Sequence, residues 1–209
     1  MGRRTTLFVS RDRAHSRGMP SNATLKRVFH QMNRGMVPLW RLGLGRFMNI
    51  WPHGFGRMLV IEHVGRRSGR PYRTPVNFTY AGRDVHCVAG FGAHTDWYRN
   101  IMANPDIAVW PPDGRWTAVA TDISDHPDRL DLIKAVLVDT GFASYVAGID
   151  PRRFNADRLA LATSAYRLVR LRPHHKSPSP DGPGSLAGVW LPVALMGFVL
   201  ARLGHRMSP

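Results

Sequence analysis

Five short β-type segments between residues 57 and 122 constrain the fold of this chain more than any other feature. Each is rich in apolar and β-branched residues, and Gly, Pro and Asp residues typical of tight turns separate them. Connections this short join neighbouring antiparallel strands. The pattern therefore predicts an antiparallel meander followed by a second hairpin. The five segments are 58–64, 74–80, 84–89, 107–110 and 116–121.

Helical spacing and a last alternating segment complete the predicted domain, which we place at residues 55–173. Residues 165–171 alternate strictly between polar and apolar, which is typical of a strand with one solvated face. Strands and helices do not alternate in the βαβ manner that builds a Rossmann fold. The sequence thus predicts an α+β fold, a small antiparallel β-barrel with flanking helices. The expected helices are 97–102, 129–138, 142–149 and 155–162.

An amphipathic helix is expected at the N-terminal side of this domain, over residues 25–52. Leu25, Val28, Phe29, Met32 and Met36 recur at helical spacing, and Lys and Arg residues occupy the other face. Two interpretations fit this pattern: the helix packs against the sheet, or it lies on an anionic membrane surface. We expect residues 1–24 to form a disordered basic leader.

The C-terminal part divides into a proline-rich linker, 174–185, and a hydrophobic segment, 186–203. Residues 186–201 contain no charged side chain. As a helix they would be about 24 Å long, short of the roughly 30 Å hydrocarbon core of a membrane. Shallow contact with a membrane, packing on a second subunit in a homodimer, and disorder are all compatible with this composition.

The charge distribution argues against a nucleic-acid-binding domain. The 209 residues carry a formal net charge of +15, from 29 Lys and Arg against 14 Asp and Glu. Residues 1–46 hold ten basic and one acidic side chain, whereas residues 47–172 hold sixteen and twelve. A nucleic-acid-binding domain would spread its basic excess over the folded part. We therefore expect no nucleic-acid partner.

Common catalytic signatures are missing from the sequence. The serine in Gly65-Arg66-Arg67-Ser68-Gly69 stands one position too late for a nucleophile elbow, and the chain contains no Walker loop. The ten histidines do not fall at metal-ligand spacings, so no metal site is expected. The single cysteine, Cys87, excludes an intrachain disulfide and fits a reducing compartment.

Two clusters could bind a ligand. Four arginines crowd the stretch from Gly65 to Pro75, where a glycine-bounded turn, a serine hydroxyl and guanidinium groups could bind a phosphate. A solvated basic turn is the alternative. The second cluster, residues 89–100, puts small residues beside aromatic ones and could receive a flat ring, although Trp97 and Ile101 equally fit a core-facing helix stripe.

Together the two clusters resemble the deazaflavin-dependent nitroreductase family, whose members are split β-barrel proteins, similar to FMN-binding barrels, that bind coenzyme F420. The resemblance covers residues 55–173. It rests on Gly65-Arg66-Arg67-Ser68-Gly69, on Pro75, and on Trp97-Tyr98-x-Asn100 followed by Ala103-Asn104-Pro105.

The resemblance implies a set of coenzyme-binding residues. Arg66, Arg67 and Ser68 would meet the phosphate and the acidic tail, a segment of the following strand would line the flat ring through backbone groups, and the second cluster would continue the site. The remaining residues of this set are Tyr72, Arg73, Thr74, Pro75, Val76, Asn77, Val88, Ala89, Gly90, Phe91, Asp96, Trp97, Tyr98, Arg99 and Asn100.

The resemblance further implies hydride transfer from reduced F420 to a quinone, a nitroaromatic compound or an activated alkene. Phe142 and Tyr145 correspond to aromatic residues of the family's substrate pocket, and Tyr145 is the candidate catalytic proton donor. A cytoplasmic protein, peripheral to the inner face of the cell membrane, would suit lipid-soluble quinones. Family members often carry Ser-Lys-Gly-Gly where this chain has Gly90-Phe91-Gly92-Ala93. This difference leaves a second interpretation open, a non-catalytic carrier of a deazaflavin, flavin or lipid.

Overall fold

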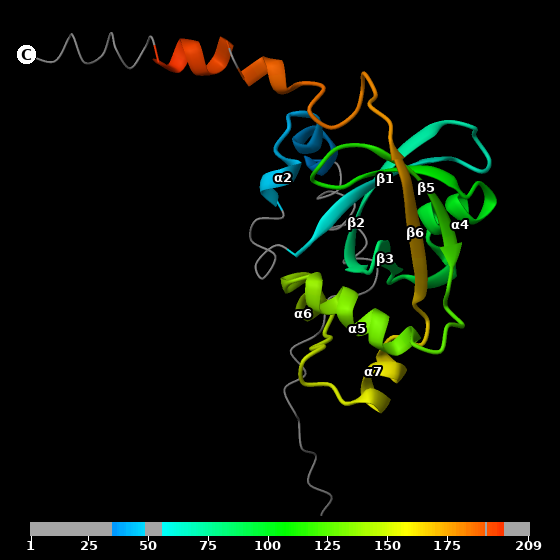
Figure 1. The fold of residues 1–209 in the computed structure, drawn as a ribbon. Coiled ribbons are helices and arrows are strands. Elements are labelled where there is room, and N and C mark those ends of the chain that lie inside the picture. Colours follow the sequence, from blue (N-terminus) through cyan, green and yellow to red (C-terminus); the bar gives the residue numbers. More distant parts are fainter. Residues whose placement is uncertain (1–34, 49–55, 191, 199–209) are drawn as a thin grey trace, which may run out of the picture.

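The chain folds into a closed antiparallel barrel (Figure 1). The computed structural model describes residues 35–48, 56–190 and 192–198. Within these ranges six strands pair in the order β1-β2-β3-β6-β5-β4. The predicted α+β antiparallel barrel is therefore confirmed. The strands are β1 Met58–Val64, β2 Pro71–Ala81, β3 Asp84–Ala89, β4 Asp106–Trp110, β5 Trp116–Asp122 and β6 Arg167–Lys176.

Helices flank the barrel at its side and at one end. α4 packs against β1 and β5, whereas α5 packs against β2 and β3. Figure 1 shows α5, α6 and α7 grouped at the end of the barrel that lies away from α2. The helices are α2 Gly45–Met48, α4 Asp96–Ala103, α5 Arg129–Asp139, α6 Phe142–Val146 and α7 Ala156–Ala162, with short 3₁₀ turns η1 Gly92–His94 and η2 Ala187–Val189.

β1 is apolar over most of its length because both of its faces are covered. Leu59 and Ile61 belong to the core inside the barrel. Met58 and Val60 point to the outside, where they pack in a second cluster with Trp40. Side chains alternate between the two faces of a strand, so a strand that is covered on both sides loses the polar alternation of a half-exposed one.

Part of the predicted N-terminal helix packs against the barrel wall. Residues 35–41 and 45–48 are helical, and a turn at 42–44 separates them. Trp40 is 1% exposed, and its Nε1 donates to the carbonyl oxygen of Trp110 at 3.0 Å. For this part the packing interpretation is confirmed. The predictions for residues 1–34, 49–55 and 199–203 lie outside the described residues.

Two strands are longer than the sequence pattern indicated. β2 begins at Pro71 instead of residue 74, because its first residues continue the pairing with β1, from Val64↔Pro71 to Met58↔Asn77. β6 continues to Lys176, where it pairs with Trp116, so residues 174–176 of the predicted linker belong to the strand. Pairing across strands extended both elements where the local sequence shows no alternation.

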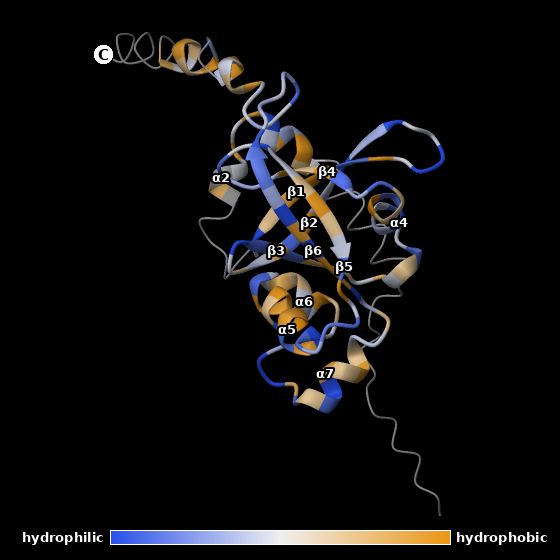
Figure 2. Cartoon of the chain, turned by 45° about the vertical axis from the view of Figure 1, so that its right-hand side comes forward, coloured by the Kyte–Doolittle hydropathy of each residue, from blue (hydrophilic) through white to orange (hydrophobic). Residues whose placement is uncertain are grey.

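The chain after β6 returns to the N-terminal helical region. The Leu186 amide donates to the Arg41 carbonyl at 2.8 Å, and Trp190 Nε1 donates to the Leu42 carbonyl at 3.0 Å. Beyond these contacts, residues 192–198 form a fully exposed helical stretch that leads away from the barrel (Figure 2). Among the described helices, none combines the length and apolar character needed to cross a membrane.

We predict that Trp40→Ala lowers the free energy of unfolding by about 3–5 kcal/mol, the usual cost of deleting a buried tryptophan side chain. Trp40→Phe keeps most of the packing and loses the hydrogen bond to Trp110, so its cost should be clearly smaller. Urea denaturation followed by circular dichroism measures both. Equal stability of Trp40→Ala and wild type would contradict the packing of residues 35–41 on the barrel.

Candidate functional site

The hairpin between β1 and β2 forms a tight, glycine-bounded loop. The Gly65 amide donates to the Arg70 carbonyl, and the Gly69 amide donates to the Gly65 carbonyl, both at 2.8 Å. Gly69 has a positive φ of 65°. At Gly65 a Cβ atom would lie 2.6 Å from both Ser68 Oγ and the Tyr72 ring, so a side chain there would displace these two exposed groups. The loop geometry thus favours glycine at both positions of the motif.

Arg66 ties this loop to α4. Its guanidinium Nη1 donates to Asp96 Oδ1 at 3.2 Å and to Asn100 Oδ1 at 2.9 Å. Its backbone amide also donates to Asn100 Oδ1, at 3.2 Å. Three of the residues predicted to form the site therefore meet, although they come from positions 30 and 34 residues apart in the chain.

A buried histidine, which the sequence analysis did not select, lies beneath the loop. His63 is 3% exposed, contacts Asn100 Nδ2 through Nδ1 at 3.3 Å, and contacts Thr74 Oγ1 through Nε2 at 3.1 Å. The ring also stacks on that of Tyr72, with centroids 5.9 Å apart. Burial lowers the pKa of His63 from 6.5 to about 4, so the ring is neutral at pH 7. Side chains two residues apart on a strand share a face, so the position of His63 after the inward-facing Ile61 could have indicated that His63 is buried.

One edge of β2 is open beside this loop. Over residues 71–77, β2 pairs with β1, whereas its pairing with β3 starts only at Phe78. No described strand pairs with the other edge of 71–77. Pro75 lies within this stretch, which fits the preference of proline for strand edges. Backbone groups of this edge therefore have no strand partner among the described residues; Pro71 and Tyr72 are exposed, whereas Pro75 and Val76 are buried.

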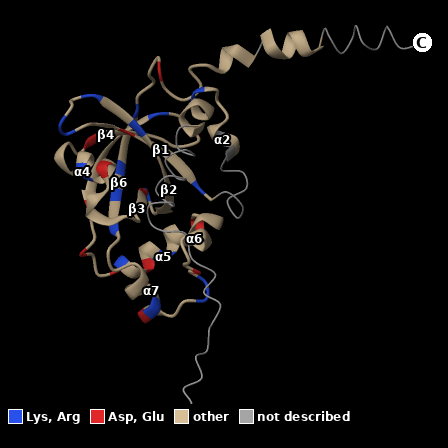
Figure 3. Ribbon diagram, turned by 180° about the vertical axis from the view of Figure 1, so that it is seen from behind, with Lys and Arg blue, Asp and Glu red and all other residues tan. Residues whose placement is uncertain are grey.

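Positive charge remains unbalanced at the tip of the loop. Asp96 neutralises Arg66, and Glu62 accepts from Arg73 Nε at 3.2 Å, while Arg73 also lies over the Trp110 ring. Arg67 and Arg70 are exposed, and their guanidinium groups make no hydrogen bond or ion pair with the described part of the chain. Figure 3 shows this basic loop projecting from the barrel. Two of its arginines are thus available to an anion.

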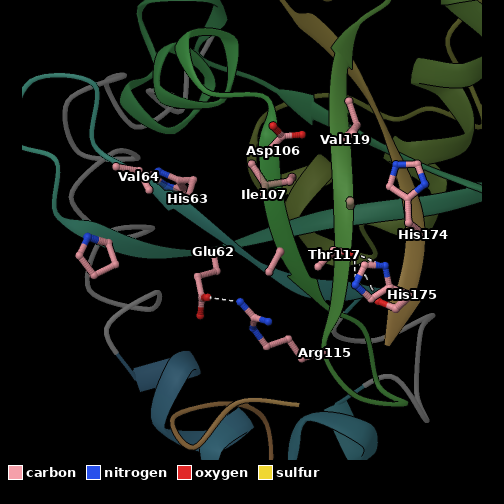
Figure 4. A pocket seen from close by; sticks show the side chains of 13 residues that line it. Glu62, His63, Val64, Asp106, Ile107, Arg115, Thr117, Val119, His174 and His175 are labelled. Atoms are coloured by element: carbon pink, nitrogen blue, oxygen red, sulfur yellow. Dashed lines mark hydrogen bonds and ion pairs between the residues drawn. The ribbon is translucent and has the colours of Figure 1, made fainter. Parts of the chain in front are cut away.

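A cavity of about 600 Å³ lies against β1, β4, β5 and β6, with His63 and the first residue of β2 in its lining (Figure 4). Val64 and Pro71, at the base of the hairpin, form one side of it. Across its floor Arg115 Nη2 donates to Glu62 Oε1 at 2.6 Å. The cavity could not be predicted from the sequence, because its lining combines residues of five strands that only the closed barrel brings together.

The other residues predicted for the site have varied surroundings. Burial raises the pKa of Tyr98 to about 12, and its hydroxyl donates to Asp122. Ser68 Oγ lies 3.3 Å from the Tyr72 hydroxyl. Val76 and Ala89 belong to the barrel core, and Trp97 packs against it. Asn77 donates to the Arg57 carbonyl, and Arg99 donates to the Ala93 carbonyl. Val88 packs against the apolar residues of α5 and α7, Phe91 is half-buried and Gly90 is exposed.

The two predicted substrate residues lie apart from the loop. Phe142 and Tyr145 are on α6 and are 43% and 48% exposed. This helix follows the end of α5, whose Asp139 carbonyl accepts from the Arg57 amide at 2.6 Å, next to the start of β1. The loop and α6 therefore lie towards opposite ends of the β1–β2 pair. Among the described residues, no group of three or more His, Cys, Asp and Glu side chains is arranged to hold a metal ion.

Comparison with known proteins assigns the family. The model of the F420H(2)-dependent quinone reductase family matches residues 43–152, which is more than half of the chain. The chain belongs to the F420H(2)-dependent quinone reductase family. It is an oxidoreductase that uses coenzyme F420, as the resemblance of the two clusters implied, and the non-catalytic carrier is not favoured.

Solved structures show distant similarity to this reductase. An F420 reductase is 17% identical, over 59% of this chain and 90% of that one, with a TM-score of 0.41. An F420-H2 dependent reductase (FDR-A) is 18% identical, over 55% of this chain and 93% of that one, with a TM-score of 0.40. A conserved hypothetical protein from Mycobacterium tuberculosis is 14% identical, over 63% and 79%, with a TM-score of 0.43. No match is found among curated proteins.

The residues of the reductase fit the coenzyme in two respects. Arg67 and Arg70 offer unengaged guanidinium groups to the phosphate and the acidic tail. The open edge of β2 offers backbone donors and acceptors to a flat heterocycle. Glu62 and Trp110 hold the Arg73 side chain, so a contribution of Arg73 to the site would come from its backbone, which is the contribution that the resemblance implies.

We predict that His63 makes the reductase less stable in acid. The unfolded chain takes up a proton near pH 6.5 and the folded one only near pH 4. The contribution of neutral His63 to the stability of the folded state is complete above pH 6.5 and is lost as the pH falls to about 4. The shift of about 2.5 pH units corresponds to about 3 kcal/mol.

The measurement is urea unfolding of wild type and of His63→Gln, which has no titrating group, between pH 7 and pH 4. As the pH falls over this range, the free energy of unfolding of wild type should decrease by about 3 kcal/mol more than that of His63→Gln. Parallel pH profiles would contradict the neutral, buried state of His63.

Proposed function

We propose that reduced F420 binds along the open edge of β2 and that the chain transfers its hydride to a quinone. The phosphate and acidic tail would lie at the loop Gly65–Arg70, and the flat ring would lie towards α6. The observation that carries this proposal is the pair of unengaged, exposed guanidinium groups, Arg67 and Arg70, at one end of an unpaired strand edge.

Electrostatics favour the loop as the anion-binding end. A guanidinium binds a phosphate through charge-assisted hydrogen bonds, and arginine is suited to paired contacts with its oxygens. The turn adds the backbone N–H groups of Arg67 and Ser68, since its other amides donate within the protein, and Ser68 adds a hydroxyl. Asp96 already pairs with Arg66, and Glu62 pairs with both Arg73 and Arg115, so the unpaired Arg67 and Arg70 supply most of the attraction.

The length of the open edge suits an extended ligand. Pro71 and Asn77 are opposite the two ends of β1 and lie about 20 Å apart, at about 3.3 Å per residue. A ligand with an anionic tail at Pro71 would therefore bring its other end near Asn77. That end of β2 adjoins Arg57 and the α5–α6 junction, through the Asn77 and Arg57 hydrogen bonds. α6, which carries the two predicted substrate residues Phe142 and Tyr145, begins at this junction.

The protein contributes orientation and a proton to the reaction. When bound, reduced F420 supplies a hydride from C5. The chain has to hold the acceptor against the ring and stabilise the oxyanion that a quinone becomes when it accepts a hydride. The Tyr145 hydroxyl can donate a proton to that oxygen. Protonation of the oxyanion then gives the two-electron-reduced hydroquinone.

The exposed aromatic and apolar side chains of α6 favour a flat, apolar acceptor. Phe142, Tyr145 and Val146 are each more than 40% exposed, which leaves an apolar face beside the ring end of the proposed site. Quinones are flat and apolar and carry the carbonyl oxygens that a tyrosine hydroxyl can reach. This combination favours quinones over small polar alkenes.

We expect Arg67→Gln/Arg70→Gln to raise the Kd for F420 by about 30-fold, since each exposed charged contact contributes about 1 kcal/mol. Fluorescence titration measures the Kd. The matched control is Arg83→Gln/Arg152→Gln, which removes the same charge from exposed arginines outside the loop. An unchanged Kd in the loop variant, or an equal loss in the control, would place the anion elsewhere.

Tyr145→Phe should reduce kcat with a quinone at least tenfold while leaving the Kd for F420 within twofold, because only the proton donor is lost. Tyr80→Phe is the control, since Tyr80 has the same 48% exposure and lies on β2. Steady-state kinetics with a soluble quinone provide the comparison. Full turnover by Tyr145→Phe would remove this residue from the mechanism.

We further propose that the C-terminal helical stretch contacts an anionic membrane surface. Val193, Leu195 and Met196 are 54–64% exposed, and the chain carries a net charge of +15. Apolar side chains that enter the interface and basic groups that attract anionic lipid act together in such binding. A quinone dissolved in the membrane would then be accessible to the reductase.

Co-sedimentation with phosphatidylglycerol vesicles tests this contact. Wild type should sediment, and Leu195→Glu/Met196→Glu should remain largely in solution. Leu161→Glu, at a still more exposed apolar position on α7, should behave like wild type. Sedimentation of the double variant at the wild-type level would refute the contact.

A further inference from the structure

A chain of contacts connects the barrel interior with the basic loop. It runs from Thr74 on β2 through His63 on β1 to Asn100 on α4, and from Asn100 to Arg66 in the loop. His63 and Asn100 are 3% and 6% exposed. The interior members of the chain are therefore withdrawn from water, where an unsatisfied polar group is costly.

The contacts of His63 with Asn100 and Thr74 fit one assignment of donors and acceptors, although the Val64 backbone also lies within hydrogen-bond reach of the ring. Asn100 Oδ1 accepts from the amide and from the guanidinium of Arg66, so the Asn100 NH₂ group must face His63. His63 Nδ1 then has to accept, and the ring proton lies on Nε2, which donates to Thr74 Oγ1. The neutral state of His63 is required for this arrangement.

Disturbing His63 would disturb Asn100. A ring with its proton on Nδ1 would face the Asn100 NH₂ group donor to donor. Relief would require the amide to rotate, which would turn Oδ1 away from both Arg66 donors. The loop would then lose the hydrogen bonds that fix its backbone at Arg66, next to Arg67.

We propose that His63 and Asn100 are positioning residues of the anion-binding loop and that Arg66 is a structural link instead of a phosphate contact. The inference rests on the proposed function, because it assumes that the loop binds the anionic part of F420. Asp96 and Asn100 occupy the Arg66 guanidinium, whereas Arg67 and Arg70 remain available. The interior chain sets the loop backbone, and the loop backbone sets these two side chains.

Two ligands separate positioning of the loop from general stability. One is F420, and the other is the same deazaflavin as its ribitol derivative, without the phosphate and the acidic tail. A variant that disorders only the loop should weaken F420 and leave the phosphate-free ligand unchanged. A variant that damages the barrel should weaken both ligands equally.

The first comparison uses His63→Leu and His63→Gln. The leucine cannot accept from Asn100, so the Kd for F420 should rise about tenfold, with a change of less than twofold for the phosphate-free ligand. The glutamine can accept from Asn100 and donate to Thr74, so it should restore the Kd to within threefold of wild type. The inference would be overturned if His63→Leu and wild type preferred F420 over the phosphate-free ligand by the same factor. It would also be overturned if His63→Leu bound both ligands more weakly by the same factor.

The second comparison uses milder changes in case His63→Leu does not fold. Thr74→Val removes the acceptor for His63 Nε2 at constant shape, and Thr74→Ser keeps it. The valine variant should weaken F420 about threefold, and ¹⁵N spectra should show partial transfer of the His63 proton to Nδ1. The inference would be overturned if Thr74→Val bound F420 as tightly as Thr74→Ser and if its His63 tautomer were unchanged.

Failure of the proposed function gives a different result. Wild type that binds F420 and the phosphate-free ligand equally well would show that the loop holds no anion. Wild type that prefers F420, with variants that keep the same preference, would refute only the positioning role. Wild-type measurements thus test the site, and the variants test how it is held.

Discussion

The antiparallel pairing of β1 with β2 is the interaction on which the rest of the structure depends. Seven residue pairs, from Val64↔Pro71 to Met58↔Asn77, fix the register of the two strands. This register aligns His63 with Tyr72 and Thr74, sets the loop at one end and leaves the other edge of β2 open. A shift by one residue would exchange the inner and outer faces of β2 and would remove the interior contacts of His63.

Sequence reasoning succeeded where the signal was local. The strands of the barrel follow from alternation and turn residues, and the glycines of the loop follow from its geometry. The start of β2 at Pro71 and the end of β6 at Lys176 depend on partner strands, so local patterns could not reveal them. The Arg66–Asn100 contact joins residues 34 positions apart and needs the packing of α4 on β1, which no periodicity specifies.

The same limit explains why the sequence cannot show which arginine side chains of the loop are already paired. Four arginines between Gly65 and Pro75 look alike in the sequence. In the fold, Arg66 and Arg73 are paired with carboxylates, whereas Arg67 and Arg70 are open to solvent. Composition counts charges, but only tertiary structure shows which of them are already neutralised. His63 was overlooked for a related reason, because a single polar residue in an apolar strand is not part of a recurring pattern.

The unit that folds extends beyond the residues that the family model matches. The family match spans residues 43–152, yet β6, which lies between β3 and β5, begins at Arg167. The match also begins after Trp40, whose indole covers the outer face of β1. A protein trimmed to the matched region would expose two strand edges and an apolar wall, and aggregation would follow. Excision of this catalytic module for engineering therefore has to retain the flanking sequence on both sides.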